Sequence, residues 1–394
     1  MKKKYDIVSI FMCIVCFISL VSSIFLITME NRIAPMISIS SFDAVGNYTW
    51  VMLAILFVIL FLSFIKGEDE NKNFLTGMIT SIFLGVVFYY TGLCAKIFTS
   101  QFVDTYRVTW GLGSYFILGA WYSIIIKCNQ NIKSNFKKFL TTFTGLFYIL
   151  MLFIMGAMNS MSISIEYFAR ADRFYLALQE HFTISILVLI SSIAFGLPLG
   201  YLCYRYKILN SIMMFFLNIV RSIPSIALIL VMVGPLSFLK SIPFFEKLGI
   251  SSFGFTPVFC ALFLYALFQI INSLSGALKT IDNVYLKTAK AMGMTNFSIM
   301  WKIQIPLVLP ILVSGIRVAI VSTFSAASLG TMVGFGGLGV FITMGGGTAV
   351  ALDLILLGAV PIIIMIFFVN FIFGLLSEWL DRRMSGKILT STKY

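Results

Sequence analysis

The residues whose types and spacing could do chemistry are few in this sequence. Gly334, Gly336 and Gly339 fit the G-x-G-x-x-G spacing of dinucleotide-binding loops. That motif needs a strand before it, a helix after it and an acidic residue about 20 positions later, whereas apolar, membrane-like sequence flanks this one. We therefore interpret these glycines, together with Gly337, as a tight turn at the outer face where backbone segments pack closely.

Other reactive residue types also lack a suitable setting. Cys13 and Cys16 form C-x-x-C inside an apolar stretch, which favours small buried side chains over redox chemistry. His181 is the only histidine, so a multi-histidine metal site is excluded. The Gly-Lys pair at 386–387 is followed by isoleucine, so it does not make a phosphate-binding loop. We expect no catalytic residue, no metal, no cofactor and no energy source within this chain.

Two arginines stand within apolar stretches and are candidates for a solute pathway. An arginine deep in a bilayer is costly and usually faces a cavity or the protein interior. For both arginines the alternative is that the side chain reaches the inner headgroups. For Arg317 we expect either structural pairing or pore lining. Pro224, between Ser222 and Ser225 in sequence, predicts a kinked or locally unwound span there. We take these five residues as candidate pore lining.

The elements that position these residues must be membrane helices. The 394 residues are 60% hydrophobic and only 11% charged, and the mean hydropathy is +1.01, whereas soluble domains carry roughly 25% charged residues. Because a spanning helix needs about 20 apolar residues, the sequence predicts an all-α polytopic protein with about ten spans. The predicted spans are Ile7–Met29, Tyr48–Ile65, Phe74–Ala95, Val108–Ile126, Phe139–Met158, Phe182–Tyr204, Ser222–Leu239, Phe255–Leu278, Leu307–Val333 and Leu354–Ser377.

The distribution of basic residues orients these spans. The first span follows three lysines and could be a signal peptide, but its apolar run exceeds the usual 7–15 residues and no small-residue cleavage site follows it. With the N-terminus inside, nineteen lysines and arginines fall in inner segments and seven in outer ones. Basic residues favour the cytoplasmic side, so we expect both termini in the cytoplasm. The net charge of +13 then reflects orientation rather than nucleic-acid binding.

One long inner segment, 279–304, has the pattern of two short helices. Apolar residues recur at roughly helical spacing with lysines between them, namely Ala289, Met292, Met294, Ile299, Met300 and Ile303. Gly293 interrupts this pattern, and the Thr-Asn pair at 295–296 is suited to cap a following helix. The pattern predicts a helix, a sharp turn and a second helix that together offer apolar residues to a cytoplasmic partner. The alternative is an amphipathic helix that lies on the membrane surface without a partner.

The segment Lys287–Pro306 resembles the signature loop of ABC importer permeases, which reads EAA, three residues, Gly, nine residues, then Ile-x-Leu-Pro. Ala289 and Gly293 match, and Ile303 and Pro306 follow at the family's spacing. Lys287 and Thr288 depart from the family's Glu and Ala. In the family this loop forms a coupling helix that docks in a groove of the ATPase subunit, so the resemblance implies the same role for these six residues.

The resemblance covers about residues 176–383 and is closest to permeases of quaternary-amine osmoprotectant importers (glycine betaine, choline and proline betaine type). The sequence RSIPSIALI at 221–229 resembles that family's Q-T-I-P-S-L-A-L stretch, with Arg221 in place of a neutral polar residue. GIRVA at 315–319 and MVGFGGLG at 332–339 resemble two further family segments. A subset of these permeases carries an N-terminal extension of five helices, as predicted here.

These observations predict three parts: an N-terminal five-helix membrane extension at 1–165, an external linker or interfacial helix at 166–180, and a permease core at 181–394 with a coupling loop at 279–306. The resemblance implies a permease subunit of an ATP-driven importer in a bacterial cytoplasmic (inner) membrane. Its partners would be cytoplasmic ABC ATPase subunits, a second permease chain and an extracytoplasmic substrate-binding protein, which we expect at the glycine-rich turn. Alternatives are an ABC permease for another small solute such as an amino acid, a secondary transporter, and a membrane scaffold.

Overall fold

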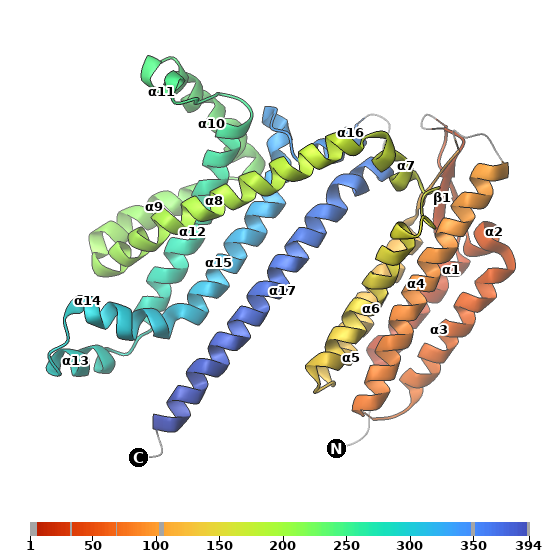
Figure 1. Ribbon diagram of the computed structural model, residues 1–394, viewed down its shortest axis with the longest axis horizontal. Coiled ribbons are helices and arrows are strands. Elements are labelled where there is room, and N and C mark those ends of the chain that lie inside the picture. The colour runs from red at the N-terminus through yellow and green to blue at the C-terminus, as the bar shows by residue number, and fades with distance from the viewer. Residues whose placement is uncertain (1–5, 32–33, 68, 102–105, 348–350, 392–394) are drawn as a thin grey trace. The chain divides into compact units, whose positions relative to one another are not determined.

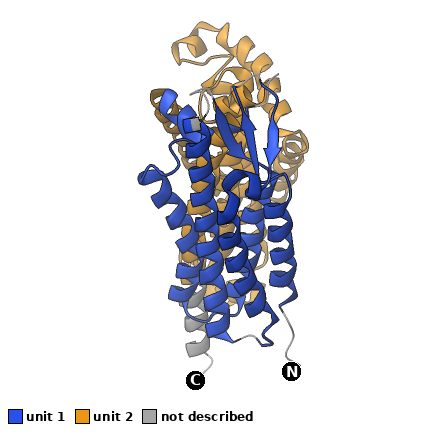
Figure 2. Cartoon of the chain, turned by 90° about the vertical axis from the view of Figure 1, so that its right-hand side faces the viewer, with its two compact units in different colours: residues 1–169, 348–353 blue, residues 170–347, 354–394 orange. Residues whose placement is uncertain are grey.

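The computed structural model describes residues 6–31, 34–67, 69–101, 106–347 and 351–391. Two compact units divide the chain (Figures 1 and 2). Unit 1 comprises residues 1–169 and 348–353, and unit 2 comprises residues 170–347 and 354–394. Both ends of the chain, which we expect in the cytoplasm, lie outside the described residues.

Unit 1 is a helical bundle with a small antiparallel sheet at one end (Figure 2). Its helices are α1 (Ile7–Val21), α2 (Ser41–Val45), α3 (Thr49–Phe64), α4 (Glu70–Gln101), α5 (Leu112–Gln130), α6 (Asn135–Ile154) and α7 (Ser162–Ala169), with a 3₁₀ turn at Gly46–Tyr48. The strands β1 (Leu26–Met29), β2 (Ile37–Ile39) and β3 (Arg107–Trp110) form a sheet of order β2-β1-β3, in which Leu26 pairs with Ile39 and Trp110.

The sheet corrects two of the predicted spans. Ile7–Met29 is not one helix, because α1 ends at Val21 and the last four residues form β1. Val108–Ile126 begins as strand β3, and its helix starts only at Leu112. Hydropathy could not separate these strands from the helices beside them, because strand residues buried in a sheet are as apolar as residues that face lipid.

Unit 2 is almost entirely helical. Its helices are α8 (Ala171–Arg205), α9 (Lys207–Ser222), α10 (Ser225–Lys240), α11 (Pro243–Lys247), α12 (Phe255–Lys279), α13 (Asn283–Ala291), α14 (Asn296–Ile299), α15 (Ile305–Ala327), α16 (Gly339–Gly345) and α17 (Leu352–Ser391). A π-helical stretch at Met300–Gln304 joins α14 to α15, and a 3₁₀ stretch at Ser328–Val333 follows α15. The pair α13 and α14 lies at the end of unit 2 opposite α11 and α16 (Figure 1).

The described residues contain seven helices that are long and apolar enough to cross a membrane, or eight if the bent pair α9 and α10 forms one span. Seven of the predicted spans correspond to these helices, and Ser222–Leu239 corresponds to the second half of the bent pair. The other two predicted spans are Ile7–Met29 and Val108–Ile126, parts of which form strands. Their helices, α1 and α5, have 15 and 19 residues. The fold is therefore a polytopic helical membrane protein, as predicted.

The predicted linker at 166–180 is helical along most of its length. Helix α7 ends at Ala169, and α8 begins at Ala171 and continues into the membrane-spanning residues. No glycine or proline interrupts residues 171–195, so nothing in the sequence stops the helix before the apolar stretch. The division between the two units falls between residues 169 and 170, inside the predicted linker.

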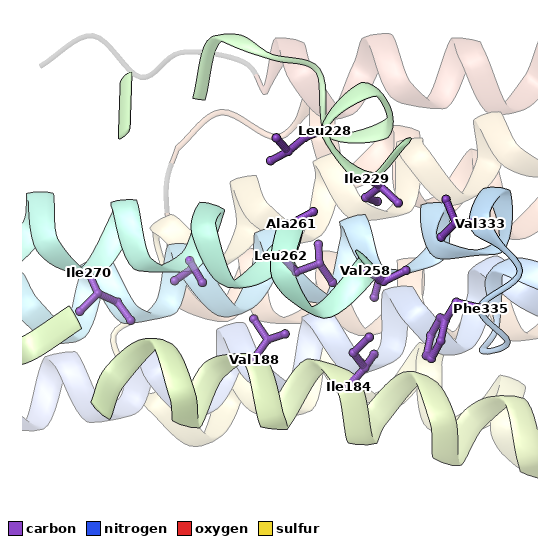
Figure 3. Packing of buried hydrophobic residues seen from close by; sticks show 13 residues of the cluster. Ile184, Val188, Leu228, Ile229, Val258, Ala261, Leu262, Ile270, Val333 and Phe335 are labelled. Carbon is purple, nitrogen blue, oxygen red and sulfur yellow. The ribbon is translucent and has the colours of Figure 1, made fainter. Parts of the chain in front are cut away.

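The core of unit 2 forms where α8, α10, α12 and α15 pack together (Figure 3). Ile184 and Val188 of α8 meet Val258 and Leu262 of α12 within one buried cluster. Glycines let α8 and α12 approach: a Cβ atom on Gly196 would lie 2.8 Å from the Ile270 side chain. Small residues at such crossings are the usual means of close packing between membrane helices, and this core holds the helices that carry the candidate site.

Candidate functional site

The coupling-loop candidate is two short helices joined by a pinned turn. Helix α13 ends at Ala291, and Gly293 has a φ of +79°, a conformation that side-chain-bearing residues rarely adopt. The Met294 N–H donates to the Ala289 carbonyl at 3.1 Å, and the Gly293 N–H donates to the Lys290 carbonyl at 2.9 Å. These two bonds are those of a Schellman motif, so Gly293 sets the angle between α13 and α14.

Side-chain caps hold the start of each short helix. The Asp282 carboxylate accepts from the Val284 N–H at 2.9 Å at the start of α13. The Thr295 hydroxyl accepts from the Ser298 N–H at 3.2 Å, which confirms the predicted cap of α14. Further along, buried Gln304 donates to the Tyr204 hydroxyl of α8 at 3.2 Å. The loop is thus capped at the start of both short helices, continues into α15, and is hydrogen-bonded to α8 through Gln304.

The apolar residues that this loop exposes are only partly the predicted ones, because Met292 is exposed as predicted whereas others are not. Ala289 and Ile299 are buried against the chain itself. Five large apolar side chains are instead between 54% and 74% exposed, and we call them the α13–α14 surface: Val284, Tyr285, Met292, Phe297 and Trp301. The Phe297 and Trp301 rings contact each other edge to face, with centroids 6.2 Å apart. This is an apolar surface at the end of a membrane protein where water, not lipid, is expected.

The six residues of the signature pattern have two different placements. Lys287, Thr288, Gly293 and Pro306 are exposed, whereas Ala289 is buried and Ile303 is half-buried. The pattern therefore describes the internal construction of the loop as well as its outer face. Sequence reasoning missed Val284, Tyr285, Phe297 and Trp301, although aromatic residues in a lysine-rich inner segment are a signal that could have identified three of them.

The predicted break at Pro224 is a sharp bend. Helices α9 and α10 meet at an angle of 111°, with Ser222 as the last residue of α9 and Ser225 as the first of α10. The Tyr265 hydroxyl of α12 donates to the Ile223 carbonyl at this break. A carbonyl freed by a broken membrane helix needs such a donor, so Tyr265 stabilises the bend.

A cavity of about 250 Å³ opens beside the bend. Arg221 and Ser225 line it from α9 and α10, and α12 and α15 supply the remaining residues, which are Leu262, Tyr265, Phe268, Gln269, Ser322, Thr323 and Ala326. The Arg221 guanidinium carbon lies 5.2 Å from the centroid of the Phe268 ring, a cation–π distance. The cavity therefore combines one cation, two aromatic rings and several neutral polar groups.

The candidate pore-lining residues are only partly brought together. Arg221 and Ser225 line the cavity, whereas Ser222 turns its hydroxyl back to the Ile219 carbonyl at 2.7 Å. Arg317 is not among the lining residues, and its Nε donates to the Asn370 amide oxygen of α17 at 2.8 Å. The sequence could not reveal this partner because it lies 53 residues away. Arg317 thus has the structural pairing that we considered for it.

The cavity also includes residues that sequence reasoning missed. Tyr265, Phe268 and Gln269 follow at the i, i+3, i+4 spacing that places residues on one face of a helix. Such a face within an apolar run is a detectable signal, although core packing gives the same pattern. Among the described residues, no group of three or more His, Cys, Asp or Glu side chains could hold a metal ion.

The glycine-rich turn packs backbone against a carboxylate. Gly334 and Gly337 have φ values of +77° and +76°. The Gly337 N–H donates to Glu180 Oε2 of α8 at 2.7 Å, and a Cβ atom on Gly336 would lie 1.9 Å from the same oxygen. A Cβ atom on Gly339 would lie 2.0 Å from a backbone carbonyl oxygen, that of Ser328. The glycines of this turn therefore allow close packing of the backbone, as we interpreted them from the sequence.

Two family models match this chain. The model described as "Binding-protein-dependent transport system inner membrane component" matches residues 192–386, and the model described as "ABC transporter permease YehY, N-terminal domain" matches residues 4–164. The matched ranges lie on either side of the start of α8. The α13–α14 loop, the residues that line the cavity and the glycine-rich turn all lie within the matched range 192–386.

Curated relatives are similar to about half of this chain. The glycine betaine/carnitine/choline transport system permease protein OpuCD of Bacillus subtilis (strain 168) is 31% identical over 206 residues, which cover 52% of this chain and 82% of that protein. The choline transport system permease protein OpuBD of the same organism is 28% identical over 229 residues, covering 58% and 93%. Among solved structures, the inward-facing MetNI methionine ABC transporter is 23% identical, covers 52% of this chain and 95% of that chain, and has a TM-score of 0.46.

The family follows from the sequence relatives, because the first of them is matched over four fifths of its own length. A permease of a binding-protein-dependent importer implies a separate ATPase subunit and a substrate-binding partner. The helix–glycine–helix loop and the apolar spans are the parts that such a subunit needs. This chain therefore belongs to the family of binding-protein-dependent inner membrane transport components, and it is a membrane-spanning permease subunit of an ATP-driven ABC importer.

Proposed function

We propose that this permease imports quaternary-amine osmoprotectants such as glycine betaine. The observation that carries the substrate class is the similarity to permeases whose names specify glycine betaine, carnitine and choline, over 82–93% of the length of the first two. An osmoprotectant import permease of Salmonella typhimurium is a further relative, 30% identical over 166 residues. ATP hydrolysis then resides in the separate ATPase subunit, and this chain supplies the pathway.

The assembly that we propose contains two permease chains, as a homodimer or as this chain paired with a paralogue. It lies in a bacterial cytoplasmic membrane with both termini in the cytoplasm, in agreement with the excess of basic residues in the predicted inner segments. The substrate-binding protein delivers solute at the outer face, where it contacts the turn containing Gly334, Gly336, Gly337 and Gly339. Two ATPase subunits bind at the inner face.

The coupling role is assigned to α13 and α14. Their five exposed apolar side chains suit a protein groove, because apolar side chains that are exposed together often mark an interaction site. The Schellman turn at Gly293 and the Gln304–Tyr204 bond support transmission of movement, because they leave the loop little freedom to bend on its own. Closure of the ATPase dimer then moves α8 and α15 and opens the pathway.

The pathway is proposed to run along the broken helix pair. Arg221 and Ser225 face the cavity beside the bend, and Ser222 and Pro224 lie at the bend itself. Broken helices are frequent at transport sites because they present backbone groups to a solute. Arg317, which is bonded to Asn370, holds α15 against α17.

Reconstitution tests the substrate class. The chain is co-expressed with its ATPase and binding-protein partners and reconstituted into liposomes, and uptake of radiolabelled glycine betaine and of an amino acid is measured with and without ATP. ATP-dependent uptake of glycine betaine is expected. Uptake that continues without the ATPase would contradict the importer assembly, and uptake of the amino acid alone would contradict the substrate class.

Substitution of Gly293 by proline tests the coupling role. Proline cannot adopt the φ of +79° and has no N–H for the bond to the Lys290 carbonyl. Gly249→Pro is the matched control, because Gly249 also has a positive φ of +77° and a turn bond, from its N–H to the Glu246 carbonyl. We expect both variants to insert normally. Gly293→Pro should lose ATPase binding and ATP-driven transport, whereas Gly249→Pro should retain ATPase binding. Wild-type transport by Gly293→Pro would refute the coupling role.

A further inference from the structure

The cavity beside the α9–α10 bend is positively charged and contains no acidic residue among those that line it. Arg221 is exposed and contacts the Phe268 ring, and within the described residues it forms no ion pair. Phe268 lies near the middle of α12, a helix of 25 residues that is long enough to cross the bilayer. The guanidinium therefore lies beside the middle of a helix that is long enough to span the bilayer.

Such a placement calls for a functional explanation. A charged side chain near the centre of a bilayer is expensive and is normally paired or directed into a water-filled cavity. The Phe268 ring stabilises one face of the guanidinium, but its N–H groups remain available to an acceptor in the cavity. Arg317 provides the internal contrast, because its Nε is already bonded to Asn370.

The start of α10 adds positive potential to the same cavity. Its N-cap is Pro224, which makes no side-chain cap hydrogen bond. The N–H groups of the first turn have no acceptor within the helix, and the aligned peptide dipoles of its 16 residues place about half a positive charge there. Ser225, the first residue of α10, lines the cavity. Arg221 and this helix end together favour an anion.

Aromatic faces in the same cavity suit a cation of a different kind. Tyr265 lines it, and the bond from its hydroxyl to the Ile223 carbonyl fixes the ring. A quaternary ammonium group is attracted to such a ring without needing a hydrogen-bond acceptor. The Phe268 face already carries Arg221, which leaves Tyr265 as the available ring. The cavity volume of about 250 Å³ lies just below the ~300–1,000 Å³ of drug-sized ligand sites, so it suits a small solute.

We propose that this cavity is a binding site for small zwitterions, in which Arg221 and the first turn of α10 receive a carboxylate while Tyr265 contacts the quaternary ammonium group. This inference deepens the proposed function and rests on it. The site discriminates among quaternary amines by their anionic group. Betaines, which carry a carboxylate, bind and pass, whereas choline, which carries a hydroxyl group instead, binds poorly at this point of the pathway.

Direct binding to the assembled permease–ATPase complex tests the proposal. The complex is placed in lipid nanodiscs without the substrate-binding protein, so that selectivity of delivery does not contribute. Binding of glycine betaine and of choline is then compared by saturation-transfer difference NMR on their trimethylammonium protons, a method suited to weak ligands. The variants are Arg221→Gln, which removes the charge, and Arg221→Lys, which keeps it. ATPase activity without solute reports whether each variant is folded and assembled.

The wild-type complex is expected to bind glycine betaine more tightly than choline. Arg221→Gln should weaken glycine betaine binding by about tenfold or more, because a charge-assisted hydrogen bond is lost, and leave choline binding unchanged. Arg221→Lys should retain most of the preference. Equal binding of the two solutes by the wild type, or equal losses for both in Arg221→Gln, would overturn the proposal. If Arg221→Gln does not assemble, two other variants decide. The proposal is overturned if Arg221→Lys loses the preference for glycine betaine over choline and Tyr265→Leu binds both solutes as tightly as the wild type.

The two proposals fail in distinguishable ways. If wild-type proteoliposomes with the binding protein import glycine betaine but the complex alone binds neither solute, the zwitterion site is wrong and the proposed function stands. If the proteoliposomes import no quaternary amine at all, the proposed substrate class is wrong, and the zwitterion site is overturned with it.

Discussion

Substitution of Gly336 by alanine is expected to break the contact between the glycine-rich turn and α8. A Cβ atom at this position would lie 1.9 Å from Oε2 and 2.7 Å from Cδ of Glu180. The backbone at Gly336 is not in the left-handed region, so the added methyl group creates a clash without backbone strain. The Glu180 side chain is flexible and moves away, and the 2.7 Å hydrogen bond from the Gly337 N–H is then lost.

The magnitude follows from the bond that is lost. Hydrogen bonds to charged groups contribute about 1.5–3 kcal/mol, so Gly336→Ala should destabilise unit 2 by about that amount. In a Glu180→Ala background the carboxylate is absent, and the same substitution should cost almost nothing. The coupling energy of this double-mutant cycle is therefore expected to be about 1.5–3 kcal/mol, well above the ~0.5 kcal/mol that independent sites show.

Gly339→Ala is the matched control. Its Cβ atom would lie 2.0 Å from the Ser328 carbonyl oxygen, which is backbone and cannot rotate away. Overpacking of this kind typically costs about 1–3 kcal/mol, and removal of the Glu180 carboxylate gives no relief. Gly339→Ala should therefore be equally destabilising in both backgrounds, with a coupling energy near zero.

The assay is thermal unfolding of the purified chain in detergent, followed by size-exclusion chromatography after heating. Melting temperatures shift by about 2–4 °C per kcal/mol in a unit of this size, so the expected differences are measurable. The reasoning is refuted if Gly336→Ala lowers the melting temperature equally with and without Glu180. It is also refuted if Glu180→Ala rescues Gly339→Ala, because the carboxylate would then act on the whole turn.

Three further substitutions have outcomes that the structure predicts. Tyr265→Phe leaves the Ile223 carbonyl without its donor and should destabilise the chain by about 1–3 kcal/mol, read as a lower melting temperature; an unchanged value would show that the bend does not need this bond. Thr295→Ala removes the α14 cap and should destabilise this helix by about 1 kcal/mol. Amide hydrogen exchange of residues 296–299 should then show roughly fivefold weaker protection. The buried Glu166 carboxylate lies 3.7 Å from the Arg107 guanidinium, and Glu166→Ala removes this partner. The substitution should lower the free energy of unfolding by about 3 kcal/mol and accelerate limited proteolysis of unit 1. Resistance to proteolysis equal to that of the wild type would contradict this.

The sequence by itself determined the class of the protein and the construction of the loop that contains α13 and α14. Apolar composition is a property of whole segments, so it identifies spans without knowledge of which helices touch. The turn at Gly293 and the cap at Thr295 are local: each depends on residues within a few positions, and the structure has both where the pattern predicts them. The break at Pro224 is local for the same reason.

Tertiary structure alone decided the features that depend on distant partners. Leu26 is in a strand because it pairs with Ile39 and Trp110, and no local pattern distinguishes it from a helical residue of the same hydropathy. Exposure of Phe297 and Trp301 depends on which face of a short helix the rest of the chain covers. The meeting of Arg221 with Phe268 is likewise a consequence of packing between helices. Local rules fix turns, caps and spans, because those involve neighbours along the chain, whereas strand pairing, exposure and cavities arise only when remote segments come together.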